Sequence, residues 1–403
     1  MNIKLIQYIR GDYRCTAAAC CIAYMTQSVA VNFAPLLFLT FNEIYSLPLS
    51  KVTVLVAISF IIQLAVDFLS ALIIDKLDQR HCMIFALIIS AIGFVGLGVL
   101  PDIIPDAFVG IIIACILYSS GSGLIEVLTS PIIESCPLGN KPSAMSFMHS
   151  FFCWGTVLVI GLSTVFFSIF GKNNWRILSC GWAFIPLVNT FLFMLVPLPS
   201  LSITGEKQSA KNFINKPLFW ATAMIMLCGG ASCHSVSQWA SAFAELNIGI
   251  TKTTGDIAGP FLFAVLMGIS RVFHSRISKK IHITSYMLTC AVLCFVSYLM
   301  ISFVRVPIVS VAGGALCGFS CGVFWPGTFS LAAEKFNHNG TVLFALLSLS
   351  GDIGCTLGPS VVGFVASCSE NNLSLGIISA AIFPLLLVVL IFLMNKSESY
   401  SLY

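Results

Sequence analysis

Residues 71–80, ALIIDKLDQR, and residues 271–280, RVFHSRISKK, lie 200 positions apart, and each forms a short charged stretch between two long apolar runs. Arg80 ends the first stretch and Lys280 ends the second. Because charged loop residues bury no apolar surface, their recurrence indicates that one structural unit occurs twice in the chain. The sequence therefore predicts two similar halves.

The repeat extends into the apolar segments that follow. In each half a glycine-rich apolar segment ends in an acid, which is Glu134 in the first half and Glu334 in the second. The next segment carries Gly155 in one copy and Gly354 in the other, so the register drifts by only one residue. The two halves therefore share the order of their segments as well as their charged loops.

The composition indicates a membrane protein. Hydrophobic residues make up 58% of the chain and charged residues only 9%, and the mean hydropathy is +0.98. One soluble core cannot hide that much apolar surface, so lipid must solvate it. Runs of roughly 20 apolar residues mark the spans, and their length and continuity favour helices over barrel strands. The expected spans are residues 15–41, 51–74, 82–100, 107–134, 143–170, 175–197, 217–245, 254–273, 283–303, 307–333, 340–366 and 374–394.

The chain divides into three expected parts. These are an N-terminal half at residues 1–197, a polar linker at 198–216 and a C-terminal half at 217–403. Each half holds six expected spans. The predicted fold class is therefore an all-α polytopic membrane protein with 12 transmembrane helices in two six-helix pseudo-repeats.

The basic residues predict the orientation. With the N-terminus inside, 15 of the 20 basic residues fall at cytoplasmic ends and loops. The five on the other side are Lys51, Lys172, Arg176, Lys252 and Arg305. This bias predicts a multi-pass protein of the plasma (inner) membrane with both termini in the cytoplasm. The net charge of +4 then reflects topology and not a nucleic-acid partner.

The 16 cysteines lie mostly within apolar runs, as Cys115, Cys290 and Cys294 do. In that setting they indicate small buried hydrophobic side chains rather than a disulfide scaffold. No pair of them shows a metal-ligand spacing with histidines nearby, and no nucleotide-binding loop is present. We expect no metal and no resident cofactor.

The first charged stretch resembles the signature loop of the major facilitator superfamily. Asp75, Lys76 and Arg80 match the family's charged positions, while Ala71 and Asp78 stand where glycines are usual. The resemblance implies an intracellular latch in which Asp75 pairs with basic residues or a helix N-terminus of the other half. The alternative is a charge cluster that only stops transfer of the chain. The expected latch residues are Asp75, Lys76, Arg80, Arg276, Lys280, Glu134 and Glu334.

Two segments of the first half resemble the fucose–proton symporter family more narrowly. In residues 123–131, GLIEVLTSP, Glu126 is followed five residues later by a proline, as in that family. In residues 148–155, MHSFFCWG, His149 stands where the family has a glutamine. The resemblance covers two spans and implies proton symport of a small polar solute such as a sugar or related metabolite.

The first span departs from the fucose symporters. Those proteins carry an acid four residues before a proline. In this chain the residue four positions before Pro35 is Val31. The nearest polar group is Asn32. Proton coupling would therefore fall to Glu126 or to an acid elsewhere.

Glu126 and His149 are expected at similar depth in the membrane. Span four runs inward, so Glu126 lies about 12 Å above Glu134, and His149 lies about 9 Å above Ser143 on the next span. Ionisable groups inside the membrane are costly without a partner, so the two could share a proton or bind a solute. A purely structural hydrogen bond between the helices is the alternative.

The remaining candidates are polar and aromatic. Asp352 lies near the midplane, about 18 Å above Gly340, and is the second candidate for coupling. Asp67 could serve coupling or support the latch. Histidines and tryptophans could form a solute platform or simply pack between helices. The full set of candidate binding or coupling residues is Glu126, His149, Asp352, Asp67, Asn32, Trp154, His234, Gln238, Trp239 and Trp325.

The sequence as a whole predicts a secondary active transporter with alternating access, and no catalytic residues. Proton symport of a small polar solute is the first hypothesis, and efflux of an amphipathic compound by proton antiport is the alternative. A membrane solute sensor and an intramembrane enzyme using Ser119, Ser120 or Ser122 with His149 are weaker alternatives, since no enzyme motif matches. One chain contains both halves, so a monomer with lipid, solute and protons as partners would suffice.

Overall fold

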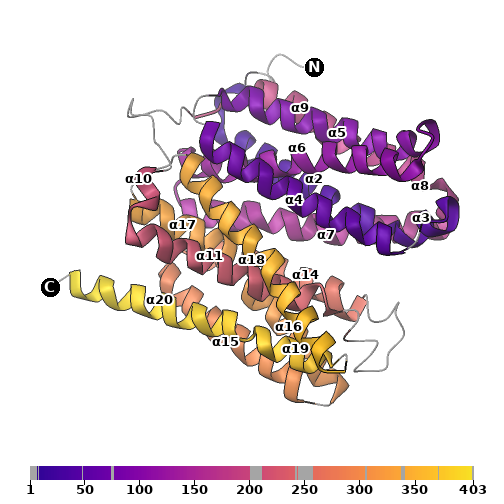
Figure 1. The fold of residues 1–403 in the computed structure, drawn as a ribbon. Helices are drawn as coiled ribbons and strands as arrows, with labels where there is room; N and C mark the ends of the chain where they lie inside the picture. The colour runs from indigo at the N-terminus through magenta and orange to yellow at the C-terminus, as the bar shows by residue number, and fades with distance from the viewer. Residues whose placement is uncertain are drawn as a thin grey trace. The chain divides into compact units, whose positions relative to one another are not determined.

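The computed structural model describes residues 7, 9–47, 49–73, 77–199, 211–240, 243, 257–304, 306–336, 341–370 and 372–401. Every regular element in these ranges is a helix (Figure 1). Ten of the helical segments found in them are long and apolar enough to cross a membrane, and a shorter apolar helix covers Ile58–Ile73. Helix occupies part of each of the twelve expected spans, so the prediction of an all-α polytopic protein is confirmed.

The first half of the chain contains the helices that carry spans one to six. They are α2 (Tyr13–Leu36), α3 (Phe38–Tyr45), α4 (Leu49–Ile73), α5 (Gln79–Ile103), α6 (Ala107–Ser135), α7 (Lys141–Phe170), η2 (Lys172–Asn174), α8 (Trp175–Trp182) and α9 (Phe184–Leu195).

The second half contains the helices that carry spans seven to twelve. They are α10 (Lys211–Ile214), α11 (Pro217–Ser237), η3 (Ile257–Phe261), α14 (Leu262–Ile277), α15 (Ile283–Phe303), α16 (Pro307–Cys321), α17 (Phe324–Phe336), α18 (Thr341–Cys368), α19 (Leu373–Ala380) and α20 (Ile382–Ser401).

Short polar residues and prolines fix where several helices begin. Asp12, Asp78 and Asp106 precede α2, α5 and α6, and each side chain accepts a hydrogen bond from a backbone N–H in the first turn. Such caps satisfy donors that have no partner within the helix. Pro217 and Pro307 begin α11 and α16, where a missing N–H costs nothing.

Several spans differ from the expected ranges: the first, sixth and twelfth are each divided into two helices, at Leu37, Ala183 and Ala381. The seventh was expected to continue to residue 245, but α11 ends at Ser237. The tenth was expected as one run, but it consists of α16 and α17, which are separated at Gly322. Residues 200–210 of the expected linker lie outside the described residues, as do Asp75 and Lys76 of the expected latch.

Contacts divide the chain into two compact units. The first comprises Met1–Gly139, Phe151–Ala210 and Asn339–Ala345. The second comprises Asn140–Ser150, Lys211–His338 and Leu346–Tyr403. Within the first unit α5 and α6 lie side by side (Figure 1). Gly121 permits this approach, because a Cβ there would overlap the Ser90 hydroxyl and the Ala86 carbonyl on α5.

Many large apolar side chains point away from the protein interior. Phe184, Phe303 and Ile308 are 70%, 70% and 76% exposed. Exposed aromatic and aliphatic surface on long helices is what lipid contact requires. These exposed side chains are therefore suited to face the bilayer, while other large apolar residues such as Phe33 and Phe329 are buried between helices.

Candidate functional site

A buried acid lies among three helices of the first unit. Glu126 of α6 is only 4% exposed, and its Oε2 accepts hydrogen bonds from the side-chain amides of Gln27 on α2 and Gln63 on α4. Both glutamines are buried as well. We call Glu126, Gln27 and Gln63 the acid–amide cluster.

Close helix packing brings the amide of α4 to the acid of α6. Gly123 lies one turn before Glu126, and a Cβ there would lie 3.1 Å from the Val66 side chain and 3.7 Å from the Gln63 Cα. A larger residue would push α4 outward. The glycine therefore lets the Gln63 side chain reach Glu126 and add a second amide donor to that of Gln27.

The cluster continues along one face of α2. The Tyr24 hydroxyl lies 3.3 Å from the Ser130 hydroxyl, and the Ser28 hydroxyl lies 2.9 Å from that of Thr156 on α7. Asn32 donates from Nδ2 to the Ser28 carbonyl at 2.9 Å and to Thr156 at 3.2 Å. Side chains three and four apart share a helix face. This face of α2 therefore presents a polar stripe to the interior of the first unit.

His149 belongs to the second compact unit, because residues 140–150 are part of that unit. Its backbone carbonyl accepts from Arg271 Nη1 at 2.6 Å, and its ring centroid lies 5.8 Å from that of Phe329. Arg271 also donates from Nε to the Gly322 carbonyl at 2.9 Å. Glu126 belongs to the first unit, so its pairing with His149 stays a prediction.

The second-half candidates are held by packing and hydrogen bonds of their own. Trp325 lies edge-on to Phe329, with ring centroids 6.4 Å apart, and covers Gly351, the residue before Asp352. Asp352 is 4% exposed on α18. Trp239 donates from Nε1 to the Pro359 carbonyl at 3.1 Å, so its polar atom is used within the bundle.

The other candidates differ in exposure. Asp67 is fully buried on α4, whereas Gln238 is exposed. Trp154 and His234 are half-buried. Exposure separates these residues without assigning any of them to the solute path, and their roles stay predictions.

The described latch residues have distinct surroundings. Arg80 donates to the Phe193 carbonyl and, at 2.9 Å, to the Val196 carbonyl, so it caps the end of α9. Glu134 is buried, whereas Arg276, Lys280 and Glu334 are exposed. The two halves therefore use these repeated positions differently, and the latch stays a prediction.

Asp78 occupies a position where a glycine was expected from the family resemblance. Its carboxylate accepts from the His81 backbone N–H at 2.9 Å and caps α5. That backbone hydrogen bond holds the pKa of Asp78 below its usual value, and the His81 side chain acts in the same direction. The departure from the family pattern is therefore compensated by a helix cap.

Gln27 and Gln63 were not predicted as site residues. The candidates expected within the spans are mainly ionisable and aromatic side chains. Uncharged amides at membrane depth carry the same signal, because each needs a hydrogen-bonding partner there. Gln27 and Gln63 both carry this signal in the sequence, but no local spacing shows that both meet Glu126.

A polytopic helical protein with polar clusters buried between its helices has the architecture of a secondary transporter. The family model of the Major Facilitator Superfamily matches residues 16–359, and the chain belongs to this family. Members carry small-molecule solutes across membranes and are not enzymes. The prediction of a major facilitator transporter is confirmed.

Solved structures show the same fold. A variant of the E. coli fucose:proton symporter, FucP, is 15% identical, with 94% of this chain and 98% of that chain covered at a TM-score of 0.74. The proton:xylose symporter XylE is 11% identical, with 94% of both chains covered at a TM-score of 0.80. The human organic anion transporter MFSD10 is 15% identical, with 95% of this chain and 100% of that chain covered at a TM-score of 0.71. No curated protein matches the chain.

Proposed function

We propose that this transporter takes up a small polar solute, such as a sugar or related metabolite, by proton symport. The observation that carries the proposal is the acid–amide cluster, in which Glu126 accepts from Gln27 and Gln63. FucP and XylE, which share the fold, are described as proton symporters of fucose and xylose. The cluster supplies a proton-binding group and polar side chains in one place.

In this mechanism Glu126 binds and releases the coupled proton. A buried carboxylate is costly, and protonation removes its charge before the helices around it rearrange. The amides of Gln27 and Gln63 hold the carboxyl group in position, and the polar stripe of α2 offers further hydrogen-bonding groups to a solute. The two six-helix halves at residues 1–197 and 217–403, joined by a linker at 198–216, would alternate between inward and outward openings.

The remaining expectations belong to the same proposal. Coupling would involve His149, with Asp352 or Asp67 as further proton carriers. The charged loops would form a cytoplasmic latch between the halves. The protein would work as a monomer in the plasma membrane with both termini in the cytoplasm.

Uptake into proteoliposomes tests the proposal. A panel of labelled sugars and related metabolites is offered with and without an inward proton gradient, using the intact protein, Glu126→Gln and Glu43→Gln. Glu43 is an exposed acid on α3 and serves as the matched control. We expect gradient-stimulated uptake of one compound that Glu126→Gln loses and Glu43→Gln keeps.

Two results would count against the proposal. Gradient-driven uptake that survives Glu126→Gln would move the coupling to Asp352 or Asp67. Uptake of no compound, together with gradient-driven export of amphipathic dyes, would favour efflux by proton antiport.

A further inference from the structure

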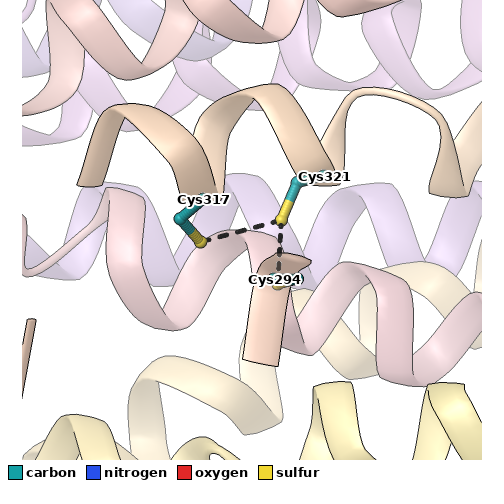
Figure 2. Close-up of side chains that lie close together, drawn as sticks. All are labelled: Cys294, Cys317 and Cys321. Atoms are coloured by element: carbon teal, nitrogen blue, oxygen red, sulfur yellow. Dashed lines mark hydrogen bonds between the residues drawn. The ribbon is translucent and has the colours of Figure 1, made fainter. Parts of the chain in front are cut away.

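Three buried cysteine thiols converge in the second unit. Cys317 and Cys321 lie four residues apart on α16, and Cys294 faces them from α15 (Figure 2). The Sγ atoms of Cys294 and Cys321 are 3.8 Å apart, and those of Cys317 and Cys321 are 3.9 Å apart. All three Sγ atoms lie within 4.8 Å of one another, and no residue of the three is more than 3% exposed.

Helix geometry explains how a sequence without a metal motif builds this group. Residues four apart share a helix face, so Cys317 and Cys321 point in one direction. Gly313 brings α16 close to α15, since a Cβ there would lie 3.0 Å from the Ile301 side chain and 3.1 Å from Met300. Cys294 lies on α15 about two turns before Ile301, and there it meets the pair on α16.

More sulfur surrounds the three thiols. The Cys233 thiol of α11 contacts the Cys321 thiol, and it lies 4.0 Å from the Met267 thioether of α14. Arg271 Nη2 lies 3.9 Å from the same Met267 sulfur. A fourth thiol therefore adjoins the cluster, a thioether lies beyond that thiol, and the buried Arg271 donates to the carbonyl of Gly322, the residue after Cys321.

We propose that Cys294, Cys317 and Cys321 bind one thiophilic divalent cation of the Zn²⁺ class. Zinc–thiolate bonds are about 2.3 Å long, which places ligand sulfurs about 3.8 Å apart in a tetrahedral site and about 4.0 Å apart in a trigonal one. The two measured distances of 3.8 and 3.9 Å match these values. A disulfide requires about 2.05 Å between sulfurs, and all three cysteines are free thiols.

Charge and ligand softness favour a divalent ion. Binding replaces the three thiol protons, so three thiolates and a divalent cation leave one net negative charge. The nearby guanidinium of Arg271 balances that charge, whereas a monovalent copper ion would leave a second negative charge uncompensated in an apolar interior. Thiolate and thioether sulfur select zinc and related soft ions over magnesium or calcium.

A mainly apolar pocket lies close to the cysteines along α16. Val236, Phe263, Ile301 and Gly314 are among its lining residues. Gly314 lies three residues before Cys317, about 4.5 Å along α16. A bound ion would join α15 to α16 inside one unit, and this role depends neither on proton coupling nor on the solute.

Cadmium binding tests the inference on the purified, reduced, full-length protein. Cd²⁺ is the probe because cadmium thiolates have a charge-transfer absorption band, and bound metal is counted by mass spectrometry after desalting. The test variant replaces Cys294, Cys317 and Cys321 with alanine. The control replaces three other buried cysteines, Cys153, Cys228 and Cys355.

We expect the intact protein and the control to bind one more equivalent of Cd²⁺ than the test variant, and Zn²⁺ in excess to compete for this equivalent. If the triple variant does not fold, Cys317→Ser alone should weaken Cd²⁺ binding at least tenfold while the elution volume of the protein is unchanged. Equal binding by the intact protein and a folded cluster variant would overturn the inference. So would a Cys294–Cys321 disulfide as the main species in peptide mapping, because it would make the pair a redox site.

Discussion

The hydrogen bond from Gln63 to Glu126 predicts a measurable coupling energy. Replacing Gln63 with leucine removes one of the two amide donors to a carboxyl group that is 4% exposed. Hydrogen bonds to charged groups contribute about 1.5 to 3 kcal/mol, whereas neutral hydrogen bonds between membrane helices average about 0.6 kcal/mol. The size of the coupling therefore reports the charge of Glu126 in the resting protein.

A double-mutant cycle measures this energy. Free energies of unfolding are determined in a reversible detergent-unfolding assay for the intact protein, Gln63→Leu, Glu126→Leu and the double variant. At neutral pH we expect a coupling of about 1.5 kcal/mol or more if Glu126 is ionised, falling toward about 0.6 kcal/mol as acid protonates it. Gln238→Leu, which changes an exposed glutamine, should show no coupling to Glu126→Leu.

A coupling indistinguishable from zero at every pH would refute this reasoning. It would mean that the glutamine finds another partner of equal quality when the acid is removed. The geometry of the acid–amide cluster would then carry no energetic information about proton binding.

Three further predictions concern other positions. Gly121→Leu should destabilise the protein by about 1 to 3 kcal/mol or prevent folding, because the side chain overlaps α5, and a thermal melt measures the loss. Asp78→Ala should cost about 0.5 to 2 kcal/mol at neutral pH. Since the pKa of Asp78 is lowered by folding, this contribution exists above its unfolded value and is lost as the pH falls through the folded value, so melts of the two proteins should converge in acid. Gln27→Lys places a cation beside Glu126 and should abolish gradient-stimulated uptake while solute exchange without a gradient persists, as a counterflow assay would show.

The sequence predicted the helices better than their interruptions. Apolar length predicted where helices lie, and helix occupies part of each expected span, because both follow from the cost of placing polar backbone and side chains in lipid. The break between α16 and α17 at Gly322 leaves hydropathy unchanged and so gave no signal. The early end of α11 at Ser237 was missed for the same reason, since the residues after it remain apolar.

The site was predictable only in part. Glu126 was found from the sequence because an acid in an apolar run is unusual. Its partners lie 99 and 63 residues away, and their meeting depends on how three helices are rotated about their axes. Hydropathy does not fix that rotation. The cysteines of α15 and α16 were missed as a group for the same reason, because no local spacing joins Cys294 to Cys321.

Glutamine amides suit an acid that must gain and lose a proton. An amide nitrogen donates to an ionised carboxylate, and the same amide can offer its oxygen to the hydroxyl of the protonated acid after rotation. A lysine or arginine partner has donors only, so it would favour the charged form throughout the transport cycle. The two amides around Glu126 can therefore satisfy both protonation states at similar cost. A group that only held the helices together would not need partners that suit both protonation states. The chemistry of Gln27 and Gln63 therefore supports proton exchange at Glu126 more strongly than the position of the acid alone does.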